Sequence, residues 1–132
     1  MRLVRSSAFF ACIVVAAVCV AAVTSDIPQR KELKRTDLSG APGMEVISSI
    51  VEVKPGEGVA RHTHHGVETA YVLQGTMIQY PGKEPTMMET GSVSMNLRDV
   101  PHAGFKVVGE QPLRLFTVHV VDKDKPLYDW VN

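Results

Sequence analysis

The chain has 132 residues with 14 basic, 14 acidic and 5 histidine side chains, and its net charge is zero when the histidines are neutral. This length predicts one domain, and the balanced charge gives no reason to expect nucleic acid or an anionic membrane surface as a partner. Both cysteines, Cys12 and Cys19, lie near the N-terminus, so no disulfide, thiolate metal site or catalytic thiol is expected in the rest of the chain.

The N-terminal segment, residues 1–25, has the pattern of a secretory signal peptide. Arg2 and Arg5 precede a long uncharged apolar run, and small residues follow it. This order is what a signal peptide needs, and we expect cleavage after Ala22 or Ser25. The alternative is an uncleaved anchor, because the uncharged stretch is about as long as one membrane span of roughly 20 residues. We therefore predict an exported protein, periplasmic or secreted, that keeps no membrane segment after cleavage.

The next stretch, residues 26–43, mixes charges with turn-forming residues and is interpreted as a polar leader with at most one strand. From Met44 onward, short apolar runs rich in Val, Ile, Thr and Tyr are separated by Gly and Pro, at roughly the 8- to 12-residue spacing of a short-stranded sheet. No longer stretch keeps the apolar period of a helix. The sequence therefore predicts an all-β sandwich or barrel over residues 44–132, with a hairpin tip at Tyr80–Lys83.

The run LRLFTVHVV, residues 113–121, is apolar at nearly every position. A strand of this kind is covered on both faces. One face is expected to point into the barrel and the other to meet a second sheet or a subunit partner, which predicts a homodimer. His119 lies in this run and is interpreted as a core histidine.

Three of the histidines lie within the short stretch RHTHHGVE. Alternate side chains of a strand point the same way, so His62 and His64 are expected on one face. His65 and Gly66 then form a turn, with His65 pointing away, after which an antiparallel partner strand would bring Glu68 beside His64. Two imidazoles and a carboxylate suit a divalent metal ion. The alternative is a polar turn that happens to be rich in histidine.

A further ligand is expected from elsewhere in the chain, and the sequence VPHAG offers His102. The histidine-rich stretch also resembles the first motif of the cupin superfamily, G-x5-H-x-H-x3-E-x6-G. All fixed positions of that motif are in register, at Gly56, His62, His64, Glu68 and Gly75.

The second cupin motif, G-x5-P-x-G-x2-H-x3-N, is matched in part. Gly91 and His102 are in register, whereas Leu97, Asp99 and Lys106 stand where Pro, Gly and Asn are usual. The short spacing between the two motifs is similar to that of small single-domain cupins. The resemblance implies a jelly-roll barrel, also called a double-stranded β-helix, with a metal ion near its centre held by His62, His64, Glu68 and His102.

Three neutral imidazoles and one carboxylate suit Mn, Fe, Co, Ni, Cu or Zn without distinguishing among them. On a six-coordinate ion, these ligands leave positions open for a small molecule. The resemblance implies a metal-dependent enzyme of the dioxygenase or isomerase type acting on a small molecule. The alternative is a non-catalytic module that binds or senses a small molecule or a metal. No acid or base in the sequence commits the protein to a reaction, so no catalytic residue is predicted.

Overall fold

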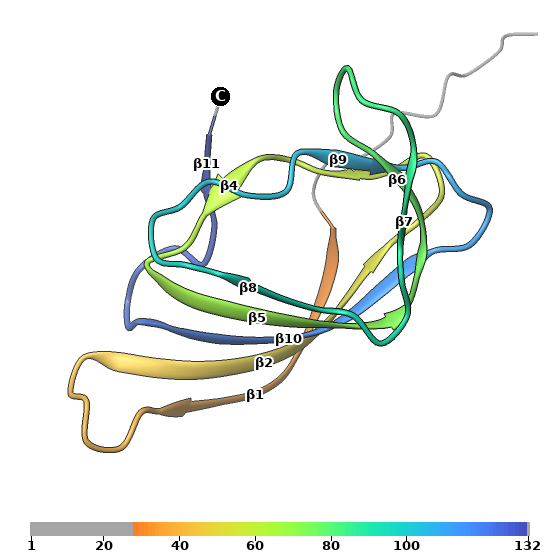
Figure 1. The fold of residues 1–132 in the computed structure, drawn as a ribbon. Coiled ribbons are helices and arrows are strands. Elements are labelled where there is room, and N and C mark those ends of the chain that lie inside the picture. Colours follow the sequence, from red (N-terminus) through yellow and green to blue (C-terminus); the bar gives the residue numbers. More distant parts are fainter. Residues whose placement is uncertain (1–27, 132) are drawn as a thin grey trace, which may run out of the picture.

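The structure, a computed structural model, describes residues 28–131, and this part of the chain contains strands, turns and loops but no helix (Figure 1). None of it could therefore cross a membrane as a long apolar helix. The predicted signal segment lies outside the described residues. The strands are β1 (Gln29–Asp37), β2 (Met44–Val53), β3 (Gly58–Val59), β4 (His62–Thr63), β5 (Gly66–Gln74), β6 (Thr76–Gln79), β7 (Thr86–Met88), β8 (Val93–Asn96), β9 (Phe105–Val107), β10 (Leu113–Asp122) and β11 (Asp129–Trp130).

The strands form two main sheets that lie opposite each other (Figure 1). The larger sheet has the order β1-β2-β10-β5-β8, and the other has the order β3-β9-β6-β7, with a small β11-β4 pair beside it. In the larger sheet β10 lies between β2 and β5 and is antiparallel to both, so segments far apart in the sequence become neighbours. The predicted all-β architecture with little helix is confirmed.

The inward faces of β2 and β10 change from apolar to polar along the sheet. Along β2, buried residues alternate with half-buried ones, as a strand with one face on a core requires. At one end of the pairing Val53 lies opposite Leu113, and both are fully buried. Further along, Ser49 lies opposite Thr117, and His119 follows. The barrel therefore has an apolar end and a polar end, and the predicted metal ligands belong to the polar end.

The apolar end contains the main hydrophobic core. Burying a valine, leucine, isoleucine or phenylalanine side chain contributes about 1.5–3 kcal/mol each. This end therefore supplies much of the stability that lets the other end hold buried polar groups. The core consists of Val51, Val53, Val59, Val72, Ile78, Phe105, Val107 and Leu113.

Part of the polar leader is built into the larger sheet. Gln29–Asp37 forms β1, an edge strand paired antiparallel with β2, and its side chains are exposed or half-buried. Arg35 lies 2.9 Å from Glu32 and 2.5 Å from Glu45. A charged edge strand discourages pairing with another chain along that edge. The division of the chain at residue 44 stays a prediction.

The hairpin tip predicted at Tyr80–Lys83 connects β6 and β7. The N–H of Lys83 donates to the carbonyl of Tyr80 at 3.1 Å, which closes the turn. Gly82 has a φ of 67°, a conformation that glycine adopts without a steric cost. The hairpin-tip prediction is confirmed.

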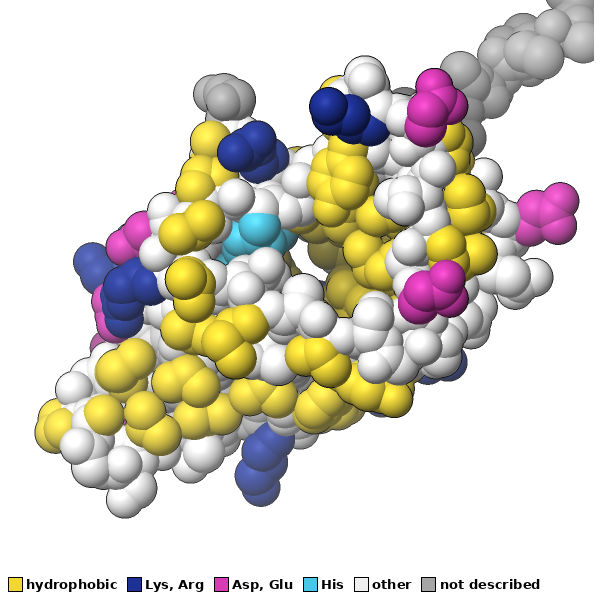
Figure 2. Space-filling view, in the orientation of Figure 1, with side chains coloured by type: hydrophobic (Ala, Val, Ile, Leu, Met, Phe, Trp, Pro, Cys, Tyr) yellow, Lys and Arg dark blue, Asp and Glu magenta, His cyan; other side chains and the backbone are white. Residues whose placement is uncertain are grey.

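The outward face of the larger sheet is apolar across its central strands, and Figure 2 shows hydrophobic side chains gathered along this side of the molecule. With strands about 4.8 Å apart and a rise of about 3.3 Å per residue, one face of this sheet covers roughly 600 Å². A standard protein interface uses about 800 Å² per partner. The face is thus somewhat smaller than a standard interface. The homodimer stays a prediction, and this outer sheet face is the interface that we expect for it. The apolar side chains on the face are Val46, Ile50, Val67, Tyr71, Leu73, Val93, Met95, Phe116, Val118 and Val120.

If the predicted homodimer forms through this face, we expect Val118→Lys to make the protein a monomer. Val118 lies at the middle of the outer sheet face, between Thr69 on β5 and Ser48 on β2, so a lysine there would bury an unpaired charge in the interface. Analytical ultracentrifugation of the purified protein at micromolar concentration measures this. Val108→Lys adds the same charge at a residue that is 47% exposed and outside this face, and it should leave the dimer intact. A monomeric parent protein would contradict the prediction.

Candidate metal centre

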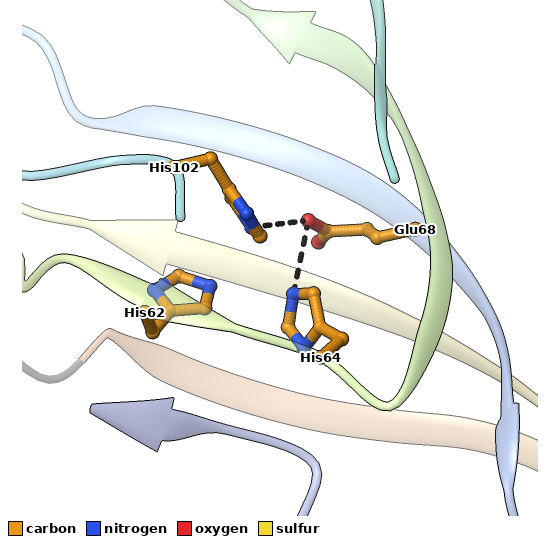
Figure 3. A group of neighbouring side chains, drawn as sticks. All are labelled: His62, His64, Glu68 and His102. Atoms are coloured by element: carbon orange, nitrogen blue, oxygen red, sulfur yellow. Dashed lines mark hydrogen bonds and ion pairs between the residues drawn. The ribbon is translucent and has the colours of Figure 1, made fainter. Parts of the chain in front are cut away.

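All four predicted ligands meet inside the polar end of the barrel (Figure 3). His62 lies on β4 and Glu68 on β5, while His64 and His102 lie in the adjoining connections. One potential ligand atom from each residue lies within 4.8 Å of the others. His102 is half-buried, and the other three residues are buried. The structure thus brings together the four residues named from the sequence, while their binding of a metal stays a prediction.

Backbone pairing joins His62 to His102, although the two residues are far apart in the sequence. The N–H of each donates to the carbonyl of the other, at 3.2 and 3.0 Å. Directly paired residues in antiparallel segments point to the same side. The centroids of the two imidazole rings accordingly lie 4.3 Å apart.

Glu68 reaches His64 by a route that differs from the expected one. The prediction that their strands pair is wrong, because β4 pairs with β11 whereas β5 pairs with β10 and β8. The chain crosses between sheets at Gly66, where a β-carbon would collide with the backbone of Val120 and Val121 on β10. Glycine therefore allows the close crossing. It leaves His64 Nε2 at 3.3 Å from Glu68 Oε2.

In each of the three histidines of the group, Nδ1 forms a hydrogen bond with a backbone carbonyl. A carbonyl oxygen only accepts hydrogen bonds, so Nδ1 carries the proton and the lone pair lies on Nε2. Holding one ring nitrogen in this way is how proteins orient histidine metal ligands. The donor set therefore fits a divalent ion bound through Nε2 atoms. The three bonds are His62 to Ala60 at 2.8 Å, His64 to Leu127 at 2.5 Å, and His102 to Val100 at 3.0 Å.

Glu68 is contacted from both neighbouring strands. Its cross-strand partners are Asn96 on β8 and His119 on β10. Asn96 Nδ2 donates to Glu68 Oε2 at 2.7 Å, and His119 Nε2 lies 3.3 Å from Oε1. The carboxylate is thus fixed in orientation before any ion binds. His119, interpreted from the sequence as a core histidine, is fully buried but borders the metal centre.

Burial and mutual contacts set the charges at the centre. Burial lowers the pKa of His62 to about 4, so this ring is neutral at neutral pH. Burial acts to raise the pKa of Glu68, but contacts with His102, His119 and His64 outweigh it and hold the pKa below its ordinary value. For His102, burial acts to lower the pKa, and the Glu68 carboxylate outweighs it and raises the pKa. The carboxylate therefore favours positive charge at the point where the imidazoles converge.

A cavity of about 280 Å³ opens beside the metal centre, and Figure 2 shows a hollow between the two sheets with a histidine at its rim. His62, Glu68 and His102 line its polar end, and apolar side chains of valine, alanine, leucine, phenylalanine, proline and methionine line most of the remainder. Thr117 also lines it, and its hydroxyl is buried without a hydrogen-bond partner among the described residues. Glu68 is the only aspartate, glutamate, lysine or arginine side chain that the structure places in the lining. The cavity can therefore hold a small, mostly apolar molecule with a polar end toward the four ligands.

The remaining sequence candidates lie away from the centre. His65 Nε2 lies 2.6 Å from Asp129 Oδ2, and its Nδ1 lies 3.5 Å from Asp99 Oδ1, on the outer side of the turn. Lys106 is exposed on β9 and faces solvent. Neither side chain belongs to the group of four ligands, which for His65 confirms the prediction that it points away from the site.

Two residues at the centre were not foreseen. Asn96 has no distinguishing local pattern, and only the β5–β8 pairing places it against Glu68. Tyr128 lies after the last long strand and contacts the rings of His62 and His64. The one available signal was the closely spaced Tyr128 and Trp130 in a polar C-terminal stretch, since tyrosine and tryptophan bring a large apolar surface that packs against other parts of a protein.

The overall fold matches solved structures of low sequence identity. A protein with a double-stranded β-helix domain from Klebsiella pneumoniae has a TM-score of 0.57 and 16% identity, over 77% of this chain and 84% of that one. The DMSP lyase DddQ from Ruegeria pomeroyi has a TM-score of 0.55 and 16% identity, over 75% of this chain and 49% of that one, so the chain spans about half the length of the lyase. The polyketide cyclase RemF from Streptomyces resistomycificus has a TM-score of 0.51 and 19% identity, over 75% and 81%. At these identities the matches establish the fold alone.

A search of curated protein sequences found no significant match. The family model described as "Cupin domain" matches residues 49–119, which is more than half of the chain. This range includes all four predicted ligands. The predicted cupin resemblance and the predicted jelly-roll fold are both confirmed, and the chain belongs to the cupin family.

Proposed function

We propose that the protein binds a divalent transition metal through His62, His64, Glu68 and His102 and presents it to a small molecule in the adjoining cavity. The observation that carries this proposal is the set of three Nδ1–carbonyl hydrogen bonds, which leaves the Nε2 lone pair of each ring available to an ion beside Glu68. A buried cluster of imidazole lone pairs around one carboxylate is costly unless a cation completes it. When bound, such an ion polarises an oxygen of its ligand as a Lewis acid.

The cavity supports a ligand that is small, largely apolar and uncharged over most of its length, with one or two oxygen donors at the metal end. Its lining has no lysine or arginine within the described chain that would select a phosphate or a polyanion. The Thr117 hydroxyl can form a hydrogen bond with one polar group of the ligand. A ligand without that group would leave the buried hydroxyl unpaired, so the site favours ligands that carry it. The structural neighbours named as a lyase and a cyclase support a small molecule in this place.

Within this frame we favour a metal-dependent enzyme of the dioxygenase or isomerase type, exported from the cytoplasm. One observation favours the alternative, a non-catalytic binding or sensing module. Apart from the four ligands, Tyr128 and Tyr80 are the only titratable side chains that the structure places in the cavity lining. An enzyme would then depend on the ion and its ligands for proton transfer, whereas a binding module needs no proton transfer at all.

Elemental analysis of the purified protein tests the metal site. We expect about one divalent ion per chain in the parent protein and a loss of most of that metal in His62→Ala and His102→Ala, because each change removes one of four donors. His65→Ala removes an imidazole that lies outside the group and should keep the metal. Stoichiometric metal in the His62 and His102 variants would contradict the assignment of these four residues as ligands. Oxygen consumption with phenols, diketones and thiols then separates an oxygenase from a binding module.

A further inference from the structure

The C-terminal segment, residues 127–131, lies outside the residues that match the cupin family but directly against the metal centre. Within this segment β11 pairs with β4, the strand that carries His62, and places Trp130 opposite His62. The N–H of Val131 also donates to the carbonyl of Arg61 at 2.9 Å. Backbone pairing therefore fixes the segment to the strand of one predicted ligand.

The same segment contacts two ligand rings. The carbonyl of Leu127 accepts the hydrogen bond from His64 Nδ1. The ring of Tyr128 lies edge-on to His62, with centroids 4.9 Å apart, and lies 5.2 Å from the ring of His64. Trp130 stacks on Tyr128 at 5.3 Å with an interplanar angle of 9°, and it also lies edge-on to His62 at 5.5 Å. Both imidazoles are thus packed against one aromatic ring whose own position is fixed by a second.

The segment also has one solvent-exposed contact outside the centre, which contributes little to holding it in place. Asp129 Oδ2 lies 2.6 Å from His65 Nε2, on the face of the turn that points away from the ligands. Tyr128 meanwhile lines the cavity. The segment therefore bridges the outer surface, the ligand rings and the cavity wall.

We infer that the C-terminal segment is a working part of the metal centre and that Tyr128 is a positioning residue. The Leu127 carbonyl sets the tautomer of His64, and the Tyr128 ring holds the imidazoles of His62 and His64 in the orientation that directs Nε2 at a shared ion. The inference rests on the proposed metal site, and it extends that site to residues that no cupin motif includes. Partners that orient metal ligands typically change metal affinity about 10- to 100-fold when they are removed.

Binding of Co²⁺ to the purified full chain tests this. Tyr128→Ala should bind Co²⁺ at least about tenfold more weakly than the parent protein in a chelator competition. The visible absorption of the bound Co²⁺ should also change, because it reports the geometry of the ligands. Tyr128→Phe keeps the ring and should restore both the affinity and the spectrum. Tyr71→Ala, which removes an aromatic side chain that is 44% exposed on the outer sheet face, is the matched control and should change neither.

The outcomes separate the inference from the proposed function. If the parent protein binds no Co²⁺, the metal site itself fails. If the parent binds Co²⁺ and Tyr128→Ala matches it in affinity and spectrum, the inference is overturned even where the melting temperature falls, because Tyr128 then only stabilises the fold. Should Tyr128→Ala not fold, Tyr128→Leu takes its place, since leucine keeps an apolar side chain and removes the ring. Parent-like affinity and spectrum in folded Tyr128→Leu would overturn the inference equally.

Discussion

A Glu68→Gln variant is expected to bind divalent metal at least about 100-fold more weakly than the parent protein while keeping its fold. Glu68 is the only anionic donor among the four predicted ligands, and it is 7% exposed. Glutamine keeps the shape of the side chain but cannot offer a charged oxygen to the ion. Changes to groups that only support ligands cost about 10- to 100-fold in affinity, and loss of the one charged ligand should cost more.

The measurement is isothermal titration or chelator competition with Zn²⁺, Mn²⁺ and Co²⁺, with circular dichroism as the check on folding. Glu52→Gln makes the same chemical change on the outward face of β2, where Glu52 lies 3.6 Å from Arg114. It should leave metal affinity within about twofold, because exposed charges contribute little at a distance. Equal affinity in Glu68→Gln and the parent would show that the carboxylate is not a ligand.

Strand alternation made much of the fold predictable from the sequence. The run MEVISSIVEV alternates buried and half-buried residues along the whole of β2, because a strand with one face on a core repeats every second residue. Gly and Pro marked the hairpin tip at Tyr80–Lys83 for an equally local reason. Three of the four ligands could also be predicted, because His62, His64 and Glu68 lie within one short stretch of sequence.

What could not be predicted depends on pairing between distant segments. Asn96 and His119 lie beside Glu68 only because β8 and β10 flank β5 in a fixed register. A shift of one residue in either pairing would turn these side chains to the other face of the sheet. The expected pairing of the His64 and Glu68 strands failed for the same reason. Local spacing places two residues close together, whereas the sheet order decides which strands carry the hydrogen bonds.

The contact of Tyr128 with the metal centre also depends on pairing between distant segments. Tyr128 reaches the imidazoles because β11 pairs with β4 across most of the domain's sequence. No periodicity in a stretch as short as residues 126–131 could predict that contact. The centre is therefore assembled in two parts. A local motif supplies most of the donors, and distant strands supply the groups that orient them.

An Ala70→Phe variant is expected to lose binding of catechol, a small oxygen-donor probe of the cavity, by at least about 100-fold, or about 2.7 kcal/mol, while keeping its metal. Ala70 lies on β5, is 6% exposed and lines the cavity between Thr117 on β10 and Ser94 on β8. A phenyl ring there occupies much of the 280 Å³ that the ligand would need. Because the new ring enters open space, the cost to folding should stay at or below the about 1–3 kcal/mol of an overpacked core.

Catechol binding to the Co²⁺-loaded protein, followed by the visible spectrum, measures the effect. Thr69→Phe is the matched control, because the adjacent residue on β5 points to the outward face of the sheet and its ring cannot enter the cavity. The control should bind catechol like the parent protein. If Ala70→Phe retains both its metal and its catechol affinity, the small molecule does not occupy this cavity. The metal would then meet its ligand from the open end of the barrel, on the side of His102, whose side chain is the most exposed of the four predicted ligands.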